Sequence, residues 1–478
     1  MLKRIHIKGY KSLRDVEVEL KPLTVLFGPN SGGKSNFLEA LQLLSRLVAS
    51  NSIKEAFAPP YRGKPLESFS FPPEGLKGLR SQKSVSFSIE VDFTLSDFVV
   101  ERVNEWVGEI ENRYEVDVSE AGELVRDELF VSERKIPISA KKNQKLIKAK
   151  NLRYRIEIEM LPDKGIVRVS DEYLAGIDEA GKPPDGANGI ENSFLCTPKK
   201  LKEKNNENTE HRVVWMKQGV DKLVSLQVGS DHSALSQHAY PSFSPYLMAA
   251  REEIAGWSFS HFEPRERMRT PNPVKSVRRM GLMGEDLPAY LNTLKAEQPR
   301  QFEALEKSLK LMLPRIEGID VHVNDHGEVE LSLKEDGVFI SARVLSEGTL
   351  RMLGLLALAG AREPPSLVGL EEPENGINPR RIELVARFLE TQTSVNQTQY
   401  IITTHSPFLA DWLPKESLFV VTRGSEDTRI EPFSVFGPLG HRLKKGRAID
   451  MALTDTVEAV DCGPSSVSER ILRGDFDG

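Results

Sequence analysis

The residues best suited to chemistry form a glycine-rich loop near the start of the 478-residue chain. Gly28-Pro-Asn-Ser-Gly-Gly-Lys-Ser35 is a complete G-x-x-x-x-G-K-[ST] phosphate loop, whose glycines let the backbone curl until successive N–H groups point at one phosphate. We expect Lys34 to reach the β- and γ-phosphates and the Ser35 hydroxyl to complete a Mg²⁺ shell. The segment therefore predicts an ATP site with contacts from Gly28, Pro29, Asn30, Ser31, Gly32, Gly33, Lys34, Ser35 and Asn36.

Adjacent carboxylates follow an apolar run later in the chain. Ser366-Leu-Val-Gly-Leu-Glu-Glu-Pro-Glu374 has the pattern of a buried strand that ends at Glu371 and Glu372. Successive strand residues point in opposite directions, but a turn at the strand end lets both carboxylates serve one site. There Glu371 would hold Mg²⁺, and Glu372 would polarise the attacking water as general base. Acidic residues after an apolar run are common, so this segment alone is weak evidence for a catalytic site. It gains weight because the same chain contains a phosphate loop.

Two further segments offer contacts to a phosphate. Tyr400-Ile-Ile-Thr-Thr-His405 is a second buried strand, and we expect its histidine at the same sheet edge, in contact with the γ-phosphate. Leu345-Ser-Glu-Gly-Thr349 precedes an apolar helix, so Ser346 and Gly348 would lie at a helix N-terminus that favours anions. An ordinary serine N-cap beside a solvated glutamate is the alternative interpretation of this segment.

The elements that position these residues follow from hydrophobic spacing. Residues 4–8 and 15–20 alternate apolar with polar side chains, which predicts two strands with one buried face each. Residues 23–27 are almost all apolar, as in a central strand covered on both faces. A helix is predicted behind the loop because apolar residues recur there at helical spacing, namely Phe37, Leu38, Leu41, Leu44 and Val48. Strand, loop and helix thus follow in the order that a phosphate loop requires.

In this order and spacing the four segments resemble the ATP-binding-cassette (ABC) ATPase heads of the RecF/SMC-like group. The likeness is greatest to the overcoming-lysogenization-defect type, without its Toprim domain. The resemblance implies an α/β P-loop NTPase fold: an ABC ATPase head with an antiparallel β subdomain and a helical signature subdomain, interrupted by a compact α/β insert. It implies a discontinuous head over 1–98 and 256–440, the insert over 99–255, and a C-terminal tail over 441–478.

Heads of this group hold ATP between two protomers. The resemblance implies that Lys34, Glu372 and His405 are catalytic and act on their own protomer's nucleotide, with Mg²⁺ at Ser35 and Glu371. It also implies a signature that contacts the partner's nucleotide, formed by Leu345, Ser346, Glu347, Gly348 and Thr349. A D-loop that crosses the dimer interface would contain Asn375, Gly376 and Asn378. Glu371 stands where the family usually has Asp, a departure expected to change the metal geometry and slow turnover.

Composition and charge exclude several other classes. A formal net charge of -6, with 39% hydrophobic and 28% charged residues, describes an ordinary globular protein. The longest apolar run, Met352–Ala361, is too short to span a bilayer, and the start of the chain has no signal-peptide pattern. Two cysteines, Cys196 and Cys462, cannot make a disulfide framework or a four-thiolate metal site. We expect a cytoplasmic protein with no membrane partner.

Three cationic runs are candidates for contact with DNA or RNA. The alternative is that they are solvated faces, which the acidic overall balance favours. The runs are Lys141, Lys142, Lys145, Lys148 and Lys150; Arg265, Arg267, Arg269, Lys275, Arg278 and Arg279; and Arg442, Lys444, Lys445 and Arg447.

Two kinds of function fit these observations. The first is an ATP-binding and hydrolysing dimerisation switch, acting as a homodimer or higher oligomer. It would be the ATPase component of an anti-phage defence or genome-maintenance system with a separately encoded effector, a nuclease or toxin. The alternatives are a nucleotide-gated scaffold with negligible hydrolysis, and a stand-alone DNA-repair ATPase that binds DNA.

Overall fold

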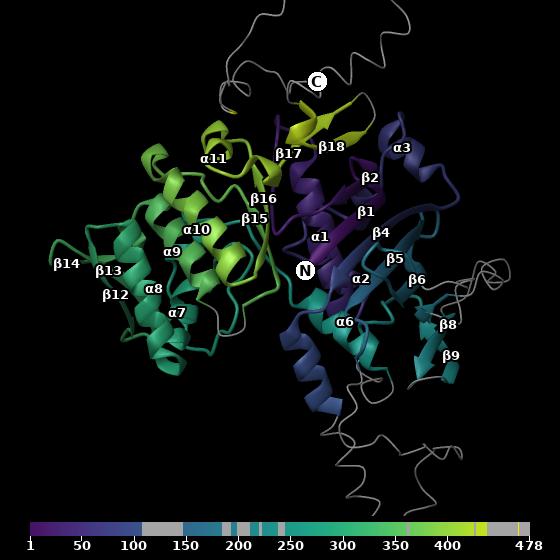
Figure 1. Ribbon diagram of the computed structural model, residues 1–478, viewed down its shortest axis with the longest axis horizontal. Helices are drawn as coiled ribbons and strands as arrows, with labels where there is room; N and C mark the ends of the chain where they lie inside the picture. The colour runs from purple at the N-terminus through teal and green to yellow at the C-terminus, as the bar shows by residue number, and fades with distance from the viewer. Residues whose placement is uncertain are drawn as a thin grey trace, which may run out of the picture.

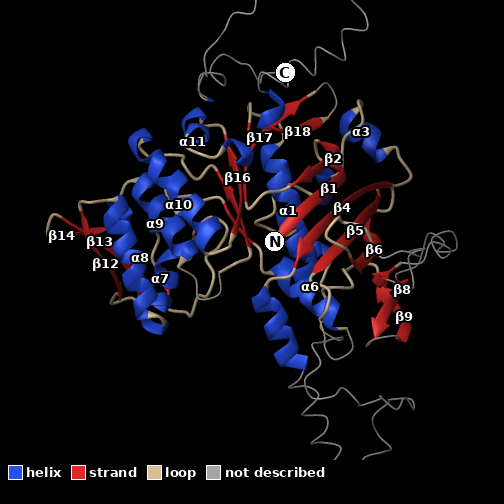
Figure 2. Cartoon of the chain, viewed as in Figure 1, coloured by secondary structure: helices blue, strands red, loops and turns tan. Residues whose placement is uncertain are grey.

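The computed structural model describes residues 1–107, 147–183, 193–197, 211–218, 222–237, 244–360, 364–424, 427–436 and 467. Two large β-sheets and a helical lobe make up this part of the chain (Figure 1). Helix α1 (Lys34–Ala49) packs against both sheets, and the lobe lies on the opposite side of the parallel sheet from α1 (Figures 1 and 2).

The six-stranded sheet has the order β10-β15-β16-β3-β17-β18. Its first five strands run parallel and β18 runs antiparallel. The strands are β3 (Leu23–Phe27), β10 (Ser258–Ser260), β15 (Leu367–Glu371), β16 (Gln399–Thr404), β17 (Leu418–Arg423) and β18 (Thr428–Pro432). Every residue of β3 is buried, as its continuous apolar run predicts, because both faces of the sheet are covered.

The second sheet is antiparallel and has the order β2-β1-β4-β5-β6-β7-β8-β9. Its strands are β1 (Leu2–Tyr10), β2 (Leu13–Glu19), β4 (Val85–Thr94), β5 (Asn151–Leu161), β6 (Ile166–Gly176), β7 (Ser193–Cys196), β8 (His211–Gln218) and β9 (Lys222–Gly229). The alternation predicted at the start of the chain is confirmed, since β1 and β2 each bury one face and expose the other.

The antiparallel sheet contains strands from both sides of residue 98, where the sequence predicts that the head ends and the insert begins. Strands β5–β9 belong to residues 99–255, yet β4 of the head pairs along its whole length with β5, from Val85↔Met160 to Thr94↔Asn151. Strands β5–β9 therefore extend the antiparallel sheet of the head. The division into head and insert stays a prediction. The tail over 441–478 lies outside the described residues, except for Val467.

The remaining elements fall into two groups. Those near α1 are α2 (Ile53–Ala56), η1 (Pro65–Ser68), α3 (Gly75–Arg80), a helix over 97–107 and α6 (Pro245–Ala255). Those of the helical lobe are η2 (Arg267–Arg269), β11 (Asn272–Pro273), α7 (Leu287–Glu297), α8 (Pro299–Met312), β12 (Ile316–Val323), β13 (Glu328–Glu335), β14 (Val338–Ser341), η3 (Ala342–Val344), α9 (Glu347–Ala359), η4 (Pro379–Arg381) and α10 (Ile382–Val395). Near the sheet's last strands lie α11 (Pro407–Asp411), η5 (Lys415–Ser417) and η6 (Phe433–Phe436).

Two hydrophobic cores meet at the parallel sheet. Leu23, Val25 and Phe27 of β3 enter the core that contains α7–α10, whereas Leu26 enters the core shared by α1 and the antiparallel sheet. This alternation follows from the two-residue period of a strand. The sheet thus holds α1 and the helical lobe in fixed positions on its two faces. Among the described residues, no helix is long and apolar enough to cross a membrane.

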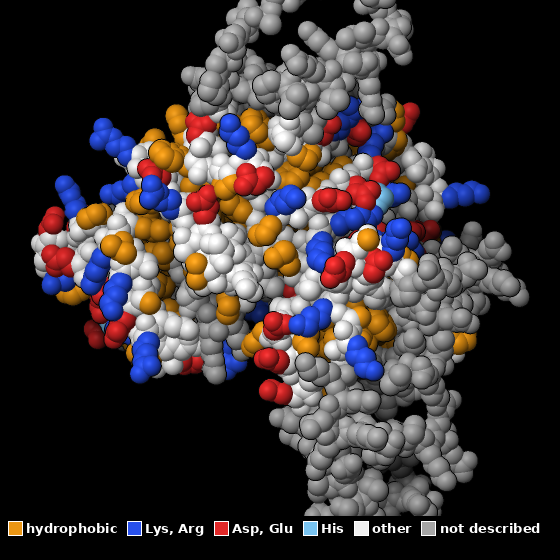
Figure 3. Space-filling view, viewed as in Figure 1, with side chains coloured by type: hydrophobic (Ala, Val, Ile, Leu, Met, Phe, Trp, Pro, Cys, Tyr) orange, Lys and Arg blue, Asp and Glu red, His pale blue; other side chains and the backbone are white. Residues whose placement is uncertain are grey.

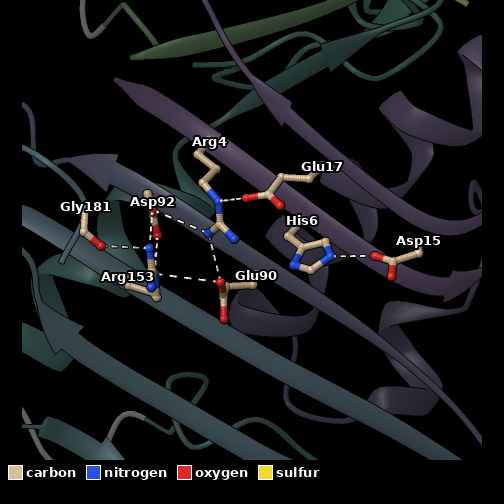
Figure 4. Close-up of polar contacts among 8 residues, drawn as sticks. All are labelled: Arg4, His6, Asp15, Glu17, Glu90, Asp92, Arg153 and Gly181. Atoms are coloured by element: carbon tan, nitrogen blue, oxygen red, sulfur yellow. Dashed lines mark hydrogen bonds and ion pairs between the residues drawn. The ribbon is translucent and has the colours of Figure 1, made fainter. Parts of the chain in front are cut away.

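Charged side chains pair across strands on the outer face of the antiparallel sheet (Figure 4). Arg153 on β5 donates to both carboxylate oxygens of Asp92 on β4, at 2.6 Å each. Arg4 on β1 donates to Glu90 at 2.8 Å and also to Glu17 on β2. The hydrogen bond from Arg4 lowers the pKa of Glu17, because it outweighs the opposing effect of burial. Such cross-strand pairs favour one register of the sheet over its slipped alternatives.

Removal of Asp92 tests this network. Asp92 is 3% exposed, so Asp92→Ala leaves the Arg153 guanidinium largely buried without its bidentate partner. We expect the free energy of unfolding to fall by about 2 kcal/mol, measured from chemical denaturation midpoints. Arg387→Ala is the control because it removes an exposed pair with Glu383 on α10 and should cost less than about 0.5 kcal/mol. Equal effects of the two variants would contradict the proposed role of the network.

Candidate active site

The phosphate loop connects β3 to α1 and adopts a tightly curled backbone. Gly28 and Gly33 have φ of 149° and 110°, and Ser31 also has a positive φ of 63°. A Cβ at Gly28 would lie 2.2 Å from the carbonyl oxygen of Val421, and one at Gly33 would lie 2.4 Å from the Thr428 hydroxyl. Only glycine fits these two positions, as the motif predicts. Strands β17 and β18 therefore hold the loop from behind.

Lys34 is the first residue of α1, directly after the loop, and is 7% exposed. Its ammonium group donates to the carbonyl oxygens of Gly28 and Pro29, at 2.8 Å each. Burial lowers the pKa of Lys34, and the nearby charges of Glu372 and Glu371 oppose that shift. The lysine, the loop and both carboxylates thus share one small region at the carboxyl edge of the parallel sheet.

A cluster of hydroxyl and amide groups braces the loop. Thr428 donates to the carbonyl oxygen of Gly32 and bonds the Ser12 hydroxyl, at 2.9 Å each. Asn36 donates to the same Ser12 oxygen at 2.8 Å. Ser12 lies in the turn between β1 and β2, so both sheets and the start of α1 are tied together at this point. Asn36 therefore faces the β1–β2 turn in this structure.

Glu371 ends β15 and is surrounded by groups that favour its charged form. Its Oε2 lies 3.0 Å from His261 Nδ1, and its Oε1 lies 3.8 Å from a guanidinium nitrogen of Arg62. Burial alone would raise the pKa of Glu371, but hydrogen bonds from His261 and Ser35, together with the charges of His261 and Arg62, hold it below its usual value. A carboxylate and a hydroxyl that already contact each other are suitable oxygen ligands for Mg²⁺.

Glu372 follows directly but turns away from the strand direction. Its φ of 47° lies in the left-handed region, and this turn is what lets two consecutive carboxylates reach one site. Its Oε1 lies 2.9 Å from His405 Nδ1, and its Oε2 accepts a 3.5 Å bond from the Asn375 amide. Its backbone N–H donates to Thr403 of β16. Glu372 and His405 therefore form a pair held by two adjacent strands.

The signature segment caps helix α9. Ser346 accepts a 3.1 Å bond from the backbone N–H of Thr349 and bonds the Thr349 hydroxyl at 2.8 Å. Leu345 is buried, Ser346 is exposed, and Glu347, Gly348 and Thr349 are partly exposed. The serine N-cap that the sequence suggested as an alternative is thus present, and the same serine lies at the surface, open to a second molecule.

The D-loop packs against the signature within the same chain. A Cβ at Gly348 would lie 2.7 Å from the carbonyl oxygen of Gly376, so glycine is required for this approach. Asn375, Gly376 and Asn378 are exposed, and the Asn378 side chain caps η4 by accepting from Arg380. From the phosphate loop the site therefore continues through Glu372 and the D-loop to the signature.

Several residues near the site were missed by sequence reasoning. His261 follows β10, a strand of only three residues with no extended apolar run to mark it. Arg62 lies on a loop after α2 and bridges Glu371 and Glu39, and nothing in its sequence context points to the site.

Glu374 and Arg351 are buried beneath the D-loop. Burial raises the pKa of Glu374, and a hydrogen bond from Thr404 opposes that shift. Arg351 interrupts an otherwise apolar helical pattern, and this isolated charge is the one sequence feature that could have marked it as unusual.

The second cationic run is largely engaged within the chain. Arg265 pairs with Glu347 at 2.8 Å, Lys275 pairs with Asp286 at 2.8 Å, and Arg269 donates to backbone carbonyl oxygens of Arg343 and Leu345. Arg267, Arg278 and Arg279 form no ion pair with the described residues. Figure 3 shows cationic and acidic side chains intermixed on the face in view. The third run, and Lys141, Lys142 and Lys145 of the first, lie outside the described residues.

Comparisons with known proteins show which ATPase domains the chain is similar to. One family model, described as an AAA ATPase domain, matches residues 1–217. Another, described as "AAA domain, putative AbiEii toxin, Type IV TA system", matches residues 254–411. Together with the phosphate loop and the parallel sheet order, these matches support an ATPase of the RecF/SMC/OLD-like ABC type.

Short segments also match curated proteins. The chain is 43% identical over 44 residues to the OLD nuclease of Thermus scotoductus, which is 9% of this chain and 8% of that protein. It is 38% identical over 55 residues to the DNA replication and repair protein RecF of Trichodesmium erythraeum, which is 11% of this chain and 14% of that protein. The chain thus matches only a small part of the length of these relatives.

Among solved structures the chain is similar to SMC heads. A SmcHead bound to the C-winged helix domain of ScpA shares 11% sequence identity, with a TM-score of 0.48 over 90% of this chain and 96% of that one. The SMC head domain from Thermotoga maritima shares 14% identity, with a TM-score of 0.39 over 90% of this chain and 98% of that one.

The brace behind the phosphate loop yields a prediction. Thr428→Val keeps the shape of the side chain but removes its bonds to Gly32 and Ser12, so the loop loses part of its fixed geometry. We expect ATP to bind about fivefold more weakly, equivalent to one lost hydrogen bond of about 1 kcal/mol, by titration calorimetry. Thr391→Val on α10 is the control, because its hydroxyl bonds only a carbonyl of its own helix. Unchanged affinity in the Thr428 variant would show that the brace does not shape the loop.

Proposed function

We propose that two copies of this chain bind ATP at a shared interface and that its hydrolysis releases them. The observation that carries the proposal is the convergence of Lys34, Glu371, Glu372 and His405 at one sheet edge, where strands β3, β15 and β16 end. The exposed Ser346 lies beyond the D-loop, at the outer end of the same surface. This is the arrangement expected of a site that a second molecule completes.

Each residue then has a role in phosphoryl transfer. The loop N–H groups and Lys34 would hold the β- and γ-phosphates, while Ser35 and Glu371 would hold Mg²⁺, which supplies charge neutralisation at the phosphate oxygens. Glu372 would accept a proton from the attacking water as the new bond to the γ-phosphorus forms and the bond to the β-phosphate oxygen breaks, releasing ADP. His405, 2.9 Å from Glu372, would orient that carboxylate and contact the γ-phosphate.

The second copy would contribute its signature. Ser346 and the N-terminus of α9 would face the γ-phosphate bound to the partner's phosphate loop, because a helix N-terminus favours an anion. A γ-phosphate that touches both copies favours the closed dimer, and its loss on hydrolysis removes that preference. The D-loop residues Asn375, Gly376 and Asn378 would cross the interface between the two sites.

We further propose a setting in defence or genome maintenance with a separate effector protein. A family description that names a putative toxin of a Type IV toxin–antitoxin system supports this, as does the short match to an OLD nuclease. In that setting the ATP-dependent dimer would be the signal passed to a nuclease or toxin. Loss of protection against phage in cells whose chain carries Lys34→Ala would support defence, and full protection would contradict it.

Turnover by single-residue variants tests the proposed chemistry. Lys34→Ala should abolish both nucleotide binding and phosphate release. Glu372→Gln should keep binding but lower the rate by at least about a hundredfold, because it removes the proton acceptor. Phosphate release with Mg·ATP measures turnover, and sedimentation measures the ATP-dependent dimer. Glu383→Gln on α10 is the matched control for the glutamate change.

The outcomes separate the alternatives. Normal turnover by Glu372→Gln would remove the proposed base. An ATP-dependent dimer without phosphate release in the unmodified protein would instead favour the nucleotide-gated scaffold. Turnover with no dimer at any ATP concentration would contradict the shared interface.

A further inference from the structure

Two oppositely charged side chains lie buried beneath the D-loop without forming an ion pair. Arg351, on the second turn of α9, is 7% exposed, and its Nε–H is buried with no hydrogen-bond partner in the part of the chain that the structure describes. Glu374, which follows the paired carboxylates, is 5% exposed. One of its oxygens accepts a 2.5 Å bond from Thr404, and the other is buried and has no partner among the described residues. Buried polar atoms are almost always bonded, so both groups call for an explanation.

The two groups complement each other and lie in one electrostatic environment. The charges of Glu347, Glu374, Glu372 and Glu263 all act on the Arg351 guanidinium. The D-loop lies over it: a Cβ at Gly376 would be 4.0 Å from Arg351 Nε and 3.6 Å from the Cβ of Glu347. A donor and an acceptor that each lack a partner among the described residues therefore lie near the same loop.

Their positions connect the two halves of the site. Arg351 is five residues after Ser346, on the helix that carries the signature. Glu374 bonds Thr404, the residue before His405, and His405 contacts Glu372. A bond between Arg351 and Glu374 would therefore link the signature helix of a chain to its own catalytic pair. No other ion pair among the described residues joins α9 to the segment 371–378.

We propose that Arg351 and Glu374 form an ion pair beneath the D-loop when two copies close on ATP, and that this pair fixes the signature helix against Glu372 and His405. An unpaired buried charge destabilises the conformation that contains it. A closed conformation in which the two charges pair is therefore stabilised relative to the open one. Less of the free energy of nucleotide binding is then needed to close the dimer. Arg351 and Glu374 are positioning residues, since neither would touch the nucleotide. The inference rests on the proposed dimer.

Double-mutant analysis of dimer formation tests the pair. The proteins are the full chain, Arg351→Gln, Glu374→Gln and the double variant, each with Mg·AMP-PNP so that hydrolysis does not intervene. We expect each single change to weaken the nucleotide-dependent dimer at least tenfold in Kd by sedimentation. Binding of the nucleotide to the monomer should change less than twofold. The double variant should match the single ones, because the same interaction is lost in all three.

Two controls keep the result interpretable. Arg387→Gln and Glu383→Gln break an exposed pair of the same residue types on α10 and should leave the dimer unchanged. Arg351→Lys keeps the charge and should recover part of the dimer affinity and of kcat, with KM unaffected, even if the glutamine variants fold poorly. A structural role alone would not produce recovery confined to kcat and dimerisation.

The possible failures are distinct. If the unmodified chain forms no dimer with Mg·AMP-PNP, both the proposed function and this pair are overturned. If it dimerises but the two glutamine variants dimerise equally well, only the pair is overturned. Effects of Arg351→Gln and Glu374→Gln that multiply in the double variant would also overturn it, because independent roles give additive free energies.

Discussion

The register of three parallel strands is the constraint on which the site depends. Phe27 of β3 lies opposite Thr404 of β16, and Thr403 of β16 lies opposite Glu371 of β15. The strands therefore end together, and Gly28, Glu372 and His405 emerge side by side at one edge. A slip of one residue in β16 would point His405 to the other face of the sheet, because side chains alternate along a strand. The two cores hold this register by burying both faces of the sheet.

Around that edge, each functional segment is supported by a different part of the fold. The phosphate loop is held from behind by β17 and β18, through Val421 and Thr428. The turn at Glu372 brings the second carboxylate to His405. The signature lies on the helical lobe, which packs on one face of the sheet through a shared core and contacts the D-loop at Gly348.

Local sequence patterns predicted the elements that carry the strongest signals. The apolar runs of β3, β15 and β16 and the helical spacing of α1 are confirmed, because burial on both faces leaves a continuous hydrophobic pattern. The chemistry assigned to the phosphate loop and paired carboxylates follows from residue types, and the structure places them together. Their roles remain predictions.

The rest depends on long-range packing that no local pattern encodes. His261 reaches Glu371 only because a three-residue strand adds to the sheet beside β15. The pairing of β5 with β4 joins residues separated by a long stretch of chain, so a sequence pattern alone suggested a separate insert. Arg351 and Glu374 are buried together by the D-loop, and neither their spacing nor their neighbours in sequence reveals it.

One mixing experiment tests the central claim that each site draws residues from two copies of the chain. Lys34→Ala removes the phosphate contact and Ser346→Arg blocks the signature, so each variant alone should be inactive. When equal amounts are mixed, a mixed dimer contains one site with an intact loop facing an intact signature, and the account predicts about a quarter of the normal ATPase rate. A mixture as inactive as its components, under conditions where mixed dimers are shown to form, would contradict the account.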